Sequence, residues 1–172
     1  MRDKMRILGI DPGIAIVGYG VVDKEGNRYK TVAYDAVTTK AHTPLEERLK
    51  IVYEGVNEII QLYKPDVMSI EELFFNNNAK TALTVGQARG VIILAAVQNN
   101  LPIYEYTPLQ VKQALTGYGR ACKSQIQQMM KSMLGLECIP KPDDVADALA
   151  IAVCHGNSVR FNSIQNFGGI RL

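Results

Sequence analysis

The sequence predicts an α/β fold with a mixed, five-stranded sheet and helices on both faces of the sheet. The chain has 172 residues, of which 47% are hydrophobic and 21% charged, a composition that suits one globular domain. Three apolar segments separated by turn residues precede residue 40, which predicts an antiparallel meander. Segments with helical spacing then alternate with short apolar runs, which predicts βα units added to the same sheet.

Each expected element has a local signature. The helix that follows the meander is expected to begin at the capping box Thr43-Pro44-Leu45-Glu46 and to stop before Pro65. The predicted strands are Met5–Asp11, Val17–Val22, Tyr29–Thr38, Val67–Leu73 and Pro102–Tyr106, and the predicted helices are Leu45–Tyr63, Ala79–Gln98, Pro108–Leu115, Lys123–Leu134 and about Asp143 to His155. This order is that of ribonuclease H-like folds, with the first and fourth strands as neighbours. We expect residues 1–156 to form the domain and 157–172 a polar, irregular tail.

Four acidic residues lie inside or directly beside apolar segments, where a buried carboxylate is costly. Asp11 and Glu71 belong to the predicted first and fourth strands, and Asp144 and Asp147 share one face of the last helix. Carboxylates that gather repel one another unless a cation joins them, and such hard oxygen ligands suit Mg²⁺ or Mn²⁺. The sequence therefore predicts a metal site.

Each acid also has a simpler explanation when it is taken alone. Asp11 can be the first residue of an Asp-Pro-Gly turn, and Asp144 can interact with the dipole of the last helix. Asp143 is better interpreted as an N-cap than as a ligand, and Glu72 should point away from Glu71. Only the recurrence of acids in three separate apolar segments favours the metal site.

Charge is unevenly divided along the chain. Residues 73–136 carry six cations and one acid, Glu105, whereas the remainder has 13 cations and 16 acids. The six cations are Lys80, Arg89, Lys112, Arg120, Lys123 and Lys131. This basic segment is either an ordinary solvated surface or a surface for a phosphate backbone beside the acidic centre.

The remaining sequence features favour an intracellular, globular protein. The three cysteines, Cys122, Cys138 and Cys154, lack CxxC spacing, which favours reduced thiols in the cytoplasm over a zinc site. The longest apolar run, Val91–Val97, is too short to cross a bilayer. A methionine-rich stripe at helical spacing within Lys123–Leu134 is expected to pack in the core or against a partner.

Six short segments follow one another in a specific order. They are Gly9-Ile10-Asp11-Pro12-Gly13, Ile70-Glu71-Glu72-Leu73-Phe74, Gly86-Gln87-Ala88-Arg89-Gly90, Val111-Lys112-Gln113, Lys123-Ser124-Gln125 and Ala146-Asp147-Ala148-Leu149-Ala150. In order and spacing these segments resemble the RuvC family of Holliday-junction resolvases, from about Arg6 to about His155. The first segment alone is weak, because actin-like proteins carry similar motifs, but all six together are specific.

The resemblance implies a homodimeric endonuclease of recombination and repair that cuts four-way junction DNA by paired, symmetric, two-metal-ion hydrolysis. It implies that Asp11, Glu71, Asp144 and Asp147 hold two Mg²⁺ ions per site, for which Mn²⁺ can substitute. It also implies Lys112 and Lys123 near the scissile phosphate, Phe74 against a base, and the RuvA–RuvB branch-migration complex as a partner. The basic segment adds Lys80, Arg89 and Arg120 as expected DNA contacts.

The chain departs from the family pattern at one position, and its dimer surface needs a separate prediction. Cys122 occupies a position where members of the family commonly have an acid, which makes the local charge more positive, and some members have histidine where this chain has Asp144. The helix Ala79–Gln98, with Ile92, Ile93 and Ala96, is the predicted dimer surface.

Two other classes of function remain open at this stage. An actin-like ATPase would use Asp11-Pro12-Gly13 at phosphate, but it needs a second glycine turn that the sequence does not have and usually a longer chain. A non-catalytic junction-binding module would keep the basic segment without needing the four acids. A junction cleavage assay with Mg²⁺ separates the three.

Overall fold

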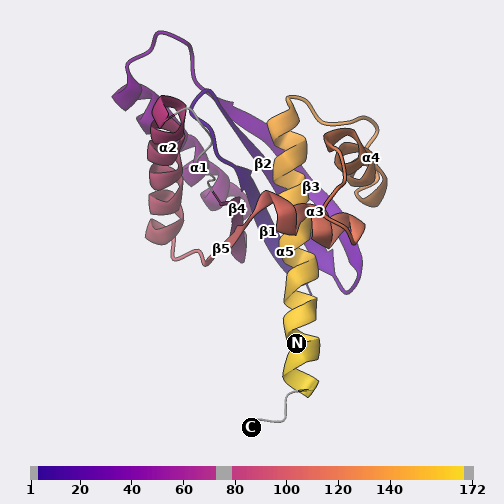
Figure 1. Ribbon diagram of the computed structural model, residues 1–172. Helices are drawn as coiled ribbons and strands as arrows, with labels where there is room; N and C mark the ends of the chain where they lie inside the picture. The colour runs from indigo at the N-terminus through magenta and orange to yellow at the C-terminus, as the bar shows by residue number, and fades with distance from the viewer. Residues whose placement is uncertain (1–3, 73–78, 169–172) are drawn as a thin grey trace.

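The computed structural model describes residues 4–72 and 79–168, with the side chains of 4–72 and 81–159. Strands and helices follow the predicted order along the chain (Figure 1). In the described residues they are β1 (Lys4–Asp11), β2 (Ile16–Glu25), β3 (Arg28–Thr38), α1 (Leu45–Tyr63), β4 (Val67–Glu71), α2 (Ala79–Gln98), β5 (Ile103–Tyr106), α3 (Pro108–Thr116), α4 (Lys123–Met133) and α5 (Asp143–Gly168).

The five strands form one mixed sheet in the order β3-β2-β1-β4-β5. The pairs β1–β2 and β2–β3 are antiparallel, whereas β1–β4 and β4–β5 are parallel. The antiparallel meander, the parallel βα additions and the contact between the first and fourth strands are therefore confirmed. This topology brings the carboxyl ends of β1 and β4 to the same edge of the sheet.

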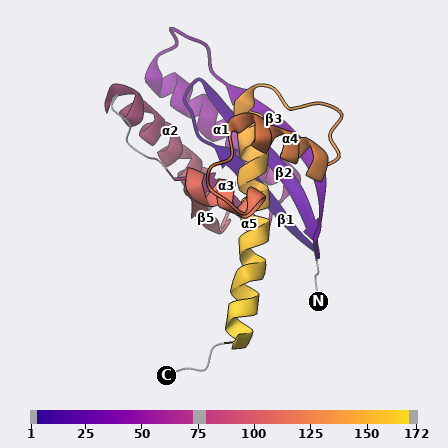
Figure 2. The same ribbon diagram turned by 45° about the vertical axis from the view of Figure 1, so that its right-hand side comes forward.

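Helices cover both faces of the sheet, α1 and α2 on one side and α3, α4 and α5 on the other (Figure 2). Side chains alternate along β1, so that Leu8 and Ile10 belong to the core beneath α1 and α2, whereas Ile7 belongs to the core beneath α5. Gly9 faces α5 as well, since a Cβ atom there would lie 2.1 Å from the carbonyl oxygen of Ala148.

Glycines let α5 lie directly on the sheet. A Cβ atom at Gly18 would lie 2.1 Å from the carbonyl oxygen of Asp144, and one at Gly20 would lie 2.6 Å from the side chain of Leu149. Contacts this short do not occur between real atoms, so any larger residue would push the helix away from β1 and β2. The three glycines, Gly9, Gly18 and Gly20, therefore fix the height of α5 above the sheet.

Two local predictions are wrong. The capping box at Thr43 is not formed, because Pro44 is the N-cap residue of α1 and makes no side-chain capping bond. The last helix does not end near His155, since α5 continues to Gly168, and its second half projects beyond the sheet (Figures 1 and 2). The residues after His155 contain no proline to stop the helix. The division of the chain at residue 156 stays a prediction.

The predicted dimer surface on α2 needs a correction. Ile92 and Ala96 are fully buried in the core formed by α2, α1 and the sheet, so they cannot form a dimer contact, whereas Ile93 is half-buried. The apolar side chains that α2 exposes are Leu83, Leu94 and Val97. Among the described residues α2 is the one helix long and apolar enough to cross a membrane, a test that core helices also pass.

Candidate active site

Asp11 and Glu71 lie side by side at the carboxyl ends of two parallel strands. Ile10 pairs with Ile70 in the β1–β4 ladder, and the next residue of each strand is the acid, Asp11 in β1 and Glu71 in β4. Both acids are two residues beyond a position that faces α5, Gly9 in β1 and Ser69 in β4. Because side chains alternate along a strand, Asp11 and Glu71 point to the α5 face of the sheet.

The first turns of α5 supply the other two predicted acids. Asp11 is paired with Gly18 across the β1–β2 ladder, and Gly18 is the glycine on which the backbone of Asp144 rests. The glycine contact thus places the amino end of α5 beside the end of β1. Asp147 lies three residues further along the same helix face, where it lines a pocket together with Glu71.

The electrostatics of Asp11 show that these carboxylates act on one another. Burial raises the pKa of Asp11 to about 8, and the negative charges of Glu71, Asp147 and Asp144 add to the increase. Burial raises the pKa of Glu71, with a further contribution from Asp147. Burial also raises the pKa of Asp147, against the opposing effect of Lys123. The site therefore carries more negative charge than its own cations balance.

Lys123, the first residue of α4, is the cation nearest to these acids. Its Nζ atom lies 3.0 Å from Oδ2 of Asp147 and 3.5 Å from Oδ2 of Asp143. Partial burial lowers the pKa of Lys123, but Asp147 and Asp143 more than offset that effect and raise it overall. Asp143 is the first residue of α5 instead of the N-cap, and its carboxylate also pairs with Lys141.

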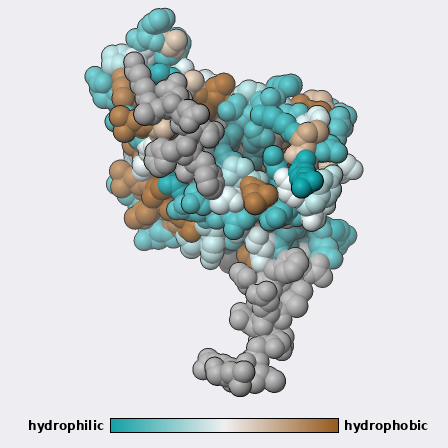
Figure 3. Space-filling model, viewed as in Figure 1, coloured by the Kyte–Doolittle hydropathy of each residue, from teal (hydrophilic) through white to brown (hydrophobic). Residues whose placement is uncertain are grey.

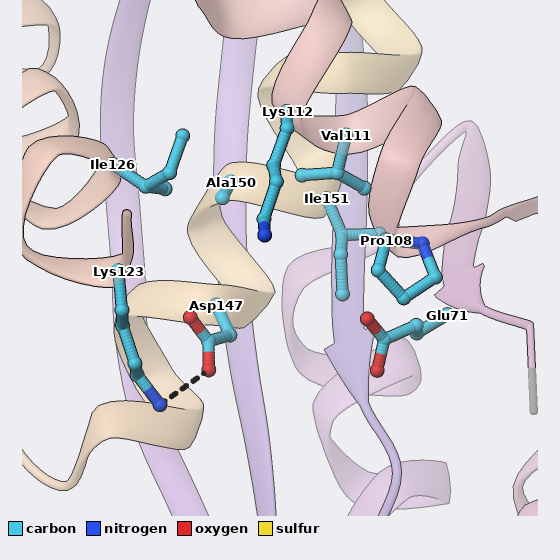
Figure 4. A pocket seen from close by; sticks show the side chains of 9 residues that line it. All are labelled: Glu71, Pro108, Val111, Lys112, Lys123, Ile126, Asp147, Ala150 and Ile151. Carbon is cyan, nitrogen blue, oxygen red and sulfur yellow. Dashed lines mark ion pairs between the residues drawn. The ribbon is translucent and has the colours of Figure 1, made fainter. Parts of the chain in front are cut away.

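A pocket of about 230 Å³ opens between α3, α4, α5 and the end of β4. Figure 4 shows the two predicted lysines, Lys112 from α3 and Lys123 from α4, lining this pocket together with Glu71 and Asp147. The other walls are mainly apolar: Pro108, Val111, Ile126, Ala150 and Ile151. Two of the four predicted acids, Glu71 and Asp147, therefore meet both lysines at one hollow, whereas Asp11 and Asp144 are not among the residues that line it.

The donor set suits a hard divalent cation. Asp11, Glu71, Asp144 and Asp147 provide carboxylate oxygens only. Burial is the main cause of the raised pKa of Asp11, and the neighbouring acids, whose charge a cation would offset, add to it. Among the described residues, no group of three or more His, Cys, Asp or Glu side chains is placed so that it could hold a metal ion. The acids act electrostatically on one another, and the ammonium group of Lys123 forms an ion pair with one of them, Asp147.

The other predicted DNA contacts differ in their surroundings. Arg89 is largely buried. Its Nη2 atom lies 2.7 Å from Oε2 of Glu105, and its Nε donates a hydrogen bond of 3.3 Å to the carbonyl of Glu71. It therefore braces the end of β4, and a DNA contact by Arg89 stays a prediction. Arg120 is exposed in the turn between α3 and α4. Phe74 and the side chain of Lys80 lie outside the described residues.

Sequence reasoning missed two residues that the structure places next to the site. Glu105 holds Arg89, and Asp143 holds Lys123 and Lys141. The i, i+4 spacing of Asp143 and Asp147 at the start of a helix was the available signal, because residues at this spacing share a face and can bind one cation. His155, which the sequence leaves without a role, is buried and shares a hydrogen bond of 2.8 Å with the hydroxyl of Tyr106.

Fold and site together define a class of protein. The mixed sheet, the carboxylates at the ends of β1 and β4, the acids of α5 and the adjacent lysines are those of a ribonuclease H-like nuclease domain that depends on a divalent metal. The comparisons with known proteins name the family. The family described as crossover junction endodeoxyribonuclease RuvC matches residues 7–155, and this chain belongs to it.

Relatives and solved structures agree with this assignment. The crossover junction endodeoxyribonuclease RuvC of Halothermothrix orenii is 60% identical over 158 residues, 92% of this chain and 96% of that protein. Its counterpart in Clostridioides difficile is 56% identical over 166 residues, 96% of this chain and 98% of that protein. The structure of Thermus thermophilus RuvC in complex with a Holliday junction substrate has a TM-score of 0.88 at 38% identity, over 92% of this chain and 96% of that one.

A more distant structure supports the fold alone. The yeast mitochondrial Holliday junction resolvase has a TM-score of 0.66 at 15% identity, over 95% of this chain and 84% of that one. The resemblance seen in the six sequence segments and the predicted ribonuclease H-like fold are both confirmed by these findings.

Proposed function

We propose that this chain is an endodeoxyribonuclease that resolves four-way DNA junctions in recombination and repair. The observation that carries the proposal is the cluster of partly buried acids around Asp11, beside a pocket that Lys112 and Lys123 line. A cluster with this excess of negative charge is costly to maintain unless it binds a cation. The likeness to a RuvC structure with a Holliday junction substrate supports junction DNA as the substrate class.

The proposed cofactor is Mg²⁺, two ions per site, with Mn²⁺ as a substitute. Asp11 and Glu71 on the sheet and Asp144 and Asp147 on α5 would hold the ions, because both supports are rigid and their carboxylates interact electrostatically. Bound there, two divalent ions would activate the attacking water and stabilise the leaving alkoxide of the phosphodiester.

The two lysines have separate roles in this proposal. Lys112 extends from α3 into the pocket that Glu71 and Asp147 line, where its ammonium group can stabilise negative charge on the reacting phosphate (Figure 4). Lys123 is held at the edge of the pocket by Asp147. The apolar walls contributed by α3, α4 and α5 limit water around the reacting group and so strengthen both electrostatic effects.

A dimer would place two such sites on one junction, as paired cuts require. The corrected candidate for its surface is the outer face of α2, where Leu83, Leu94 and Val97 are 65%, 48% and 59% exposed. Gly90 lies between them in sequence at the same helical spacing, and a Cβ atom there would meet nothing within 4 Å. Figure 3 shows hydrophobic side chains gathered on the side of the molecule where α2 lies. A cytoplasmic location and coupling to the RuvA–RuvB complex remain part of the proposal.

The central test is cleavage of a synthetic four-way junction. With Mg²⁺, the wild-type chain is expected to produce paired, symmetric nicks, and Asp11→Asn should slow cleavage by at least about 100-fold while junction binding persists. Asp35→Asn is the matched control, because Asp35 is an exposed acid on β3 away from the pocket. Binding without nicks by the wild-type chain would favour a junction-binding module, and ATP turnover would favour an actin-like enzyme.

The dimer has a test of its own. Leu94→Glu is expected to shift the protein from dimer to monomer in sedimentation velocity, because a carboxylate on the α2 surface cannot be buried between two subunits. Leu62→Glu on α1 provides the control, since Leu62 is 71% exposed and also apolar. A dimer that survives Leu94→Glu but dissociates in Leu62→Glu would move the interface to α1.

A further inference from the structure

Lys123 has two carboxylate partners on the first two turns of α5. Its Nζ atom lies 3.0 Å from Asp147 and 3.5 Å from Asp143, and these two acids are one helical turn apart on the same face. Asp143 in turn holds a second cation, because Nζ of Lys141 lies 3.0 Å from its other oxygen. Lys123 thus pairs both with Asp147, which lines the pocket, and with Asp143, which does not.

The position of Lys123 is otherwise an unfavourable one. It is the first residue of α4, which has no acid in its first turn, and the positive end of a helix dipole disfavours a cation there. Two carboxylates from a different helix offset this cost. The lysine is therefore held in place by α5, and any change in the charge of Asp147 alters how strongly it is held.

Asp147 cannot serve the lysine and a divalent ion equally. A carboxylate oxygen 3.0 Å from an ammonium group binds a metal ion less strongly, because the two cations repel each other. Metal binding through that oxygen of Asp147 therefore competes with Lys123. Asp143 is a second carboxylate that the same ammonium group already reaches, and it does not line the pocket.

We propose that Asp143 is a positioning residue that takes over Lys123 when Asp147 binds a divalent ion. The transfer keeps the ammonium group at the rim of the pocket, near the phosphate that is to be cut, while it releases the oxygen of Asp147. This inference rests on the proposed function, since it assumes that Asp147 is a metal ligand. It adds a residue outside the four acids that controls how easily the site accepts the metal.

Titration with Mn²⁺ in the absence of DNA tests the proposal, with free Mn²⁺ followed by electron paramagnetic resonance. Asp143→Asn should raise the Kd for Mn²⁺ about two- to fivefold, the range that an exposed ion pair can contribute. Lys123→Gln should lower the Kd, because a competing cation is removed. In the Lys123→Gln background, Asp143→Asn should change the Kd by less than about 1.5-fold, because an exposed charge acting only through solvent is screened.

Two further variants separate positioning from a general loss of charge. Asp143→Glu, which keeps the carboxylate, should restore Mn²⁺ affinity to within about twofold of wild type. Glu137→Gln removes an exposed acid from the same α4–α5 connection and should leave the Kd unchanged. An equal loss of affinity from Asp143→Asn in both lysine backgrounds would overturn the inference. So would a wild-type Kd in Asp143→Asn, or a failure of Asp143→Glu to restore binding.

The same titration tells this inference apart from the proposed function. If the wild-type chain does not bind Mn²⁺, or if Asp11→Asn and Asp147→Asn bind it as well as wild type, the proposed metal site is wrong. If those two variants lose Mn²⁺ while the double-variant cycle shows no coupling between residues 143 and 123, the metal site stands and the role of Asp143 is rejected.

Discussion

Two acids at opposite ends of the β1–β2 hairpin have nearly opposite surroundings. Asp23 on β2 is 3% exposed and pairs with two cations, Arg6 at 2.7 Å and Lys4 at 2.9 Å. Hydrogen bonds and charge from Arg6 and Lys4 lower its pKa. Burial raises the pKa of Asp11, at the end of β1, to about 8, and three neighbouring acids add to the increase.

The contrast separates a structural carboxylate from one suited to binding. Arg6 lies directly opposite Asp23 in the β1–β2 register, so the hairpin itself neutralises that charge. Opposite Asp11 lies Gly18, which provides no charge and instead admits the backbone of α5 with its further acids. A paired acid stabilises the folded chain, whereas gathered acids lower its stability until a cation arrives.

The largest expected difference is in stability. Asp23→Asn should lower the free energy of unfolding by about 3 kcal/mol, because it leaves the partly buried Arg6 without its charged partner. Asp11→Asn should raise that free energy by about 1–2 kcal/mol in EDTA, because it removes repulsion among the acids. Urea unfolding of both variants measures the difference. A destabilised Asp11→Asn variant would mean that Asp11 holds the fold together as Asp23 does.

The pH dependence of stability should have opposite signs for the two acids. The folded-state pKa of Asp11 is raised, so its contribution is fully present below its unfolded pKa and is lost as pH rises toward about 8. We expect the metal-free protein to lose roughly 2 kcal/mol between pH 5 and 8 relative to Asp11→Asn, less than Asp11 alone would give because Glu71 and Asp147 share the proton uptake.

Asp23 contributes in the other direction and in another pH range. Its pKa is lowered, so its contribution is present above its unfolded value and is lost as pH falls through its folded-state value. Urea unfolding at several pH values measures both effects. Saturating Mg²⁺ should abolish the loss of stability toward pH 8, because the ion takes the place of the proton. A slope that is unchanged by Mg²⁺ would argue against metal binding at Asp11.

The same comparison shows what sequence patterns can predict. Asp11 and Asp23 both adjoin apolar residues, so the criterion that pointed to the metal site does not by itself separate them. The difference lies in the residue opposite each acid, which depends on the hairpin register. Asp11 and Glu71 lie side by side, as the sequence predicts, because topology places the ends of β1 and β4 together, and topology follows from the order of elements. Their role as metal ligands stays a prediction.

The errors have related causes. The buried and exposed sides of α2 could not be assigned because its apolar residues occur on several faces, so periodicity gave little contrast. The ion pairs of Arg89 with Glu105 and of Lys123 with Asp143 join elements that are distant in the chain, and spacing does not encode such contacts. The predicted cap at Thr43 is not formed because the N-cap residue of α1 is Pro44, one residue later than predicted.

The height of α5 above the sheet should matter at Gly18, opposite Asp11, and not at Gly26 in the turn between β2 and β3. Gly18→Ala places a Cβ atom against the backbone of Asp144, so we expect it to cost about 2 kcal/mol and to weaken Mn²⁺ binding by displacing the first turn of α5. Gly26→Ala is the control: its φ of +59° makes a side chain unfavourable by about 1 kcal/mol, but nothing lies within 4 Å of its Cβ. Equal Mn²⁺ affinity in both variants would remove α5 placement from the metal site.

The smallest effects are expected for two arginines that repeat the contrast between a paired and a solvent-facing charge. Arg89 is bound to Glu105 and to the carbonyl of Glu71, so Arg89→Ala should cost about 1 kcal/mol of stability. Because the charge of Arg89 is already paired, Arg89→Ala should hardly change how junction affinity depends on salt.

Arg120 is exposed between the two helices that carry Lys112 and Lys123. Arg120→Ala should keep wild-type stability and reduce the slope of log affinity against log salt by about one unit, as the loss of one phosphate contact would. Junction binding over a series of salt concentrations, together with urea unfolding, measures both quantities. A reduced slope in Arg89→Ala with an unchanged slope in Arg120→Ala would reverse these roles and make Arg89 the DNA contact.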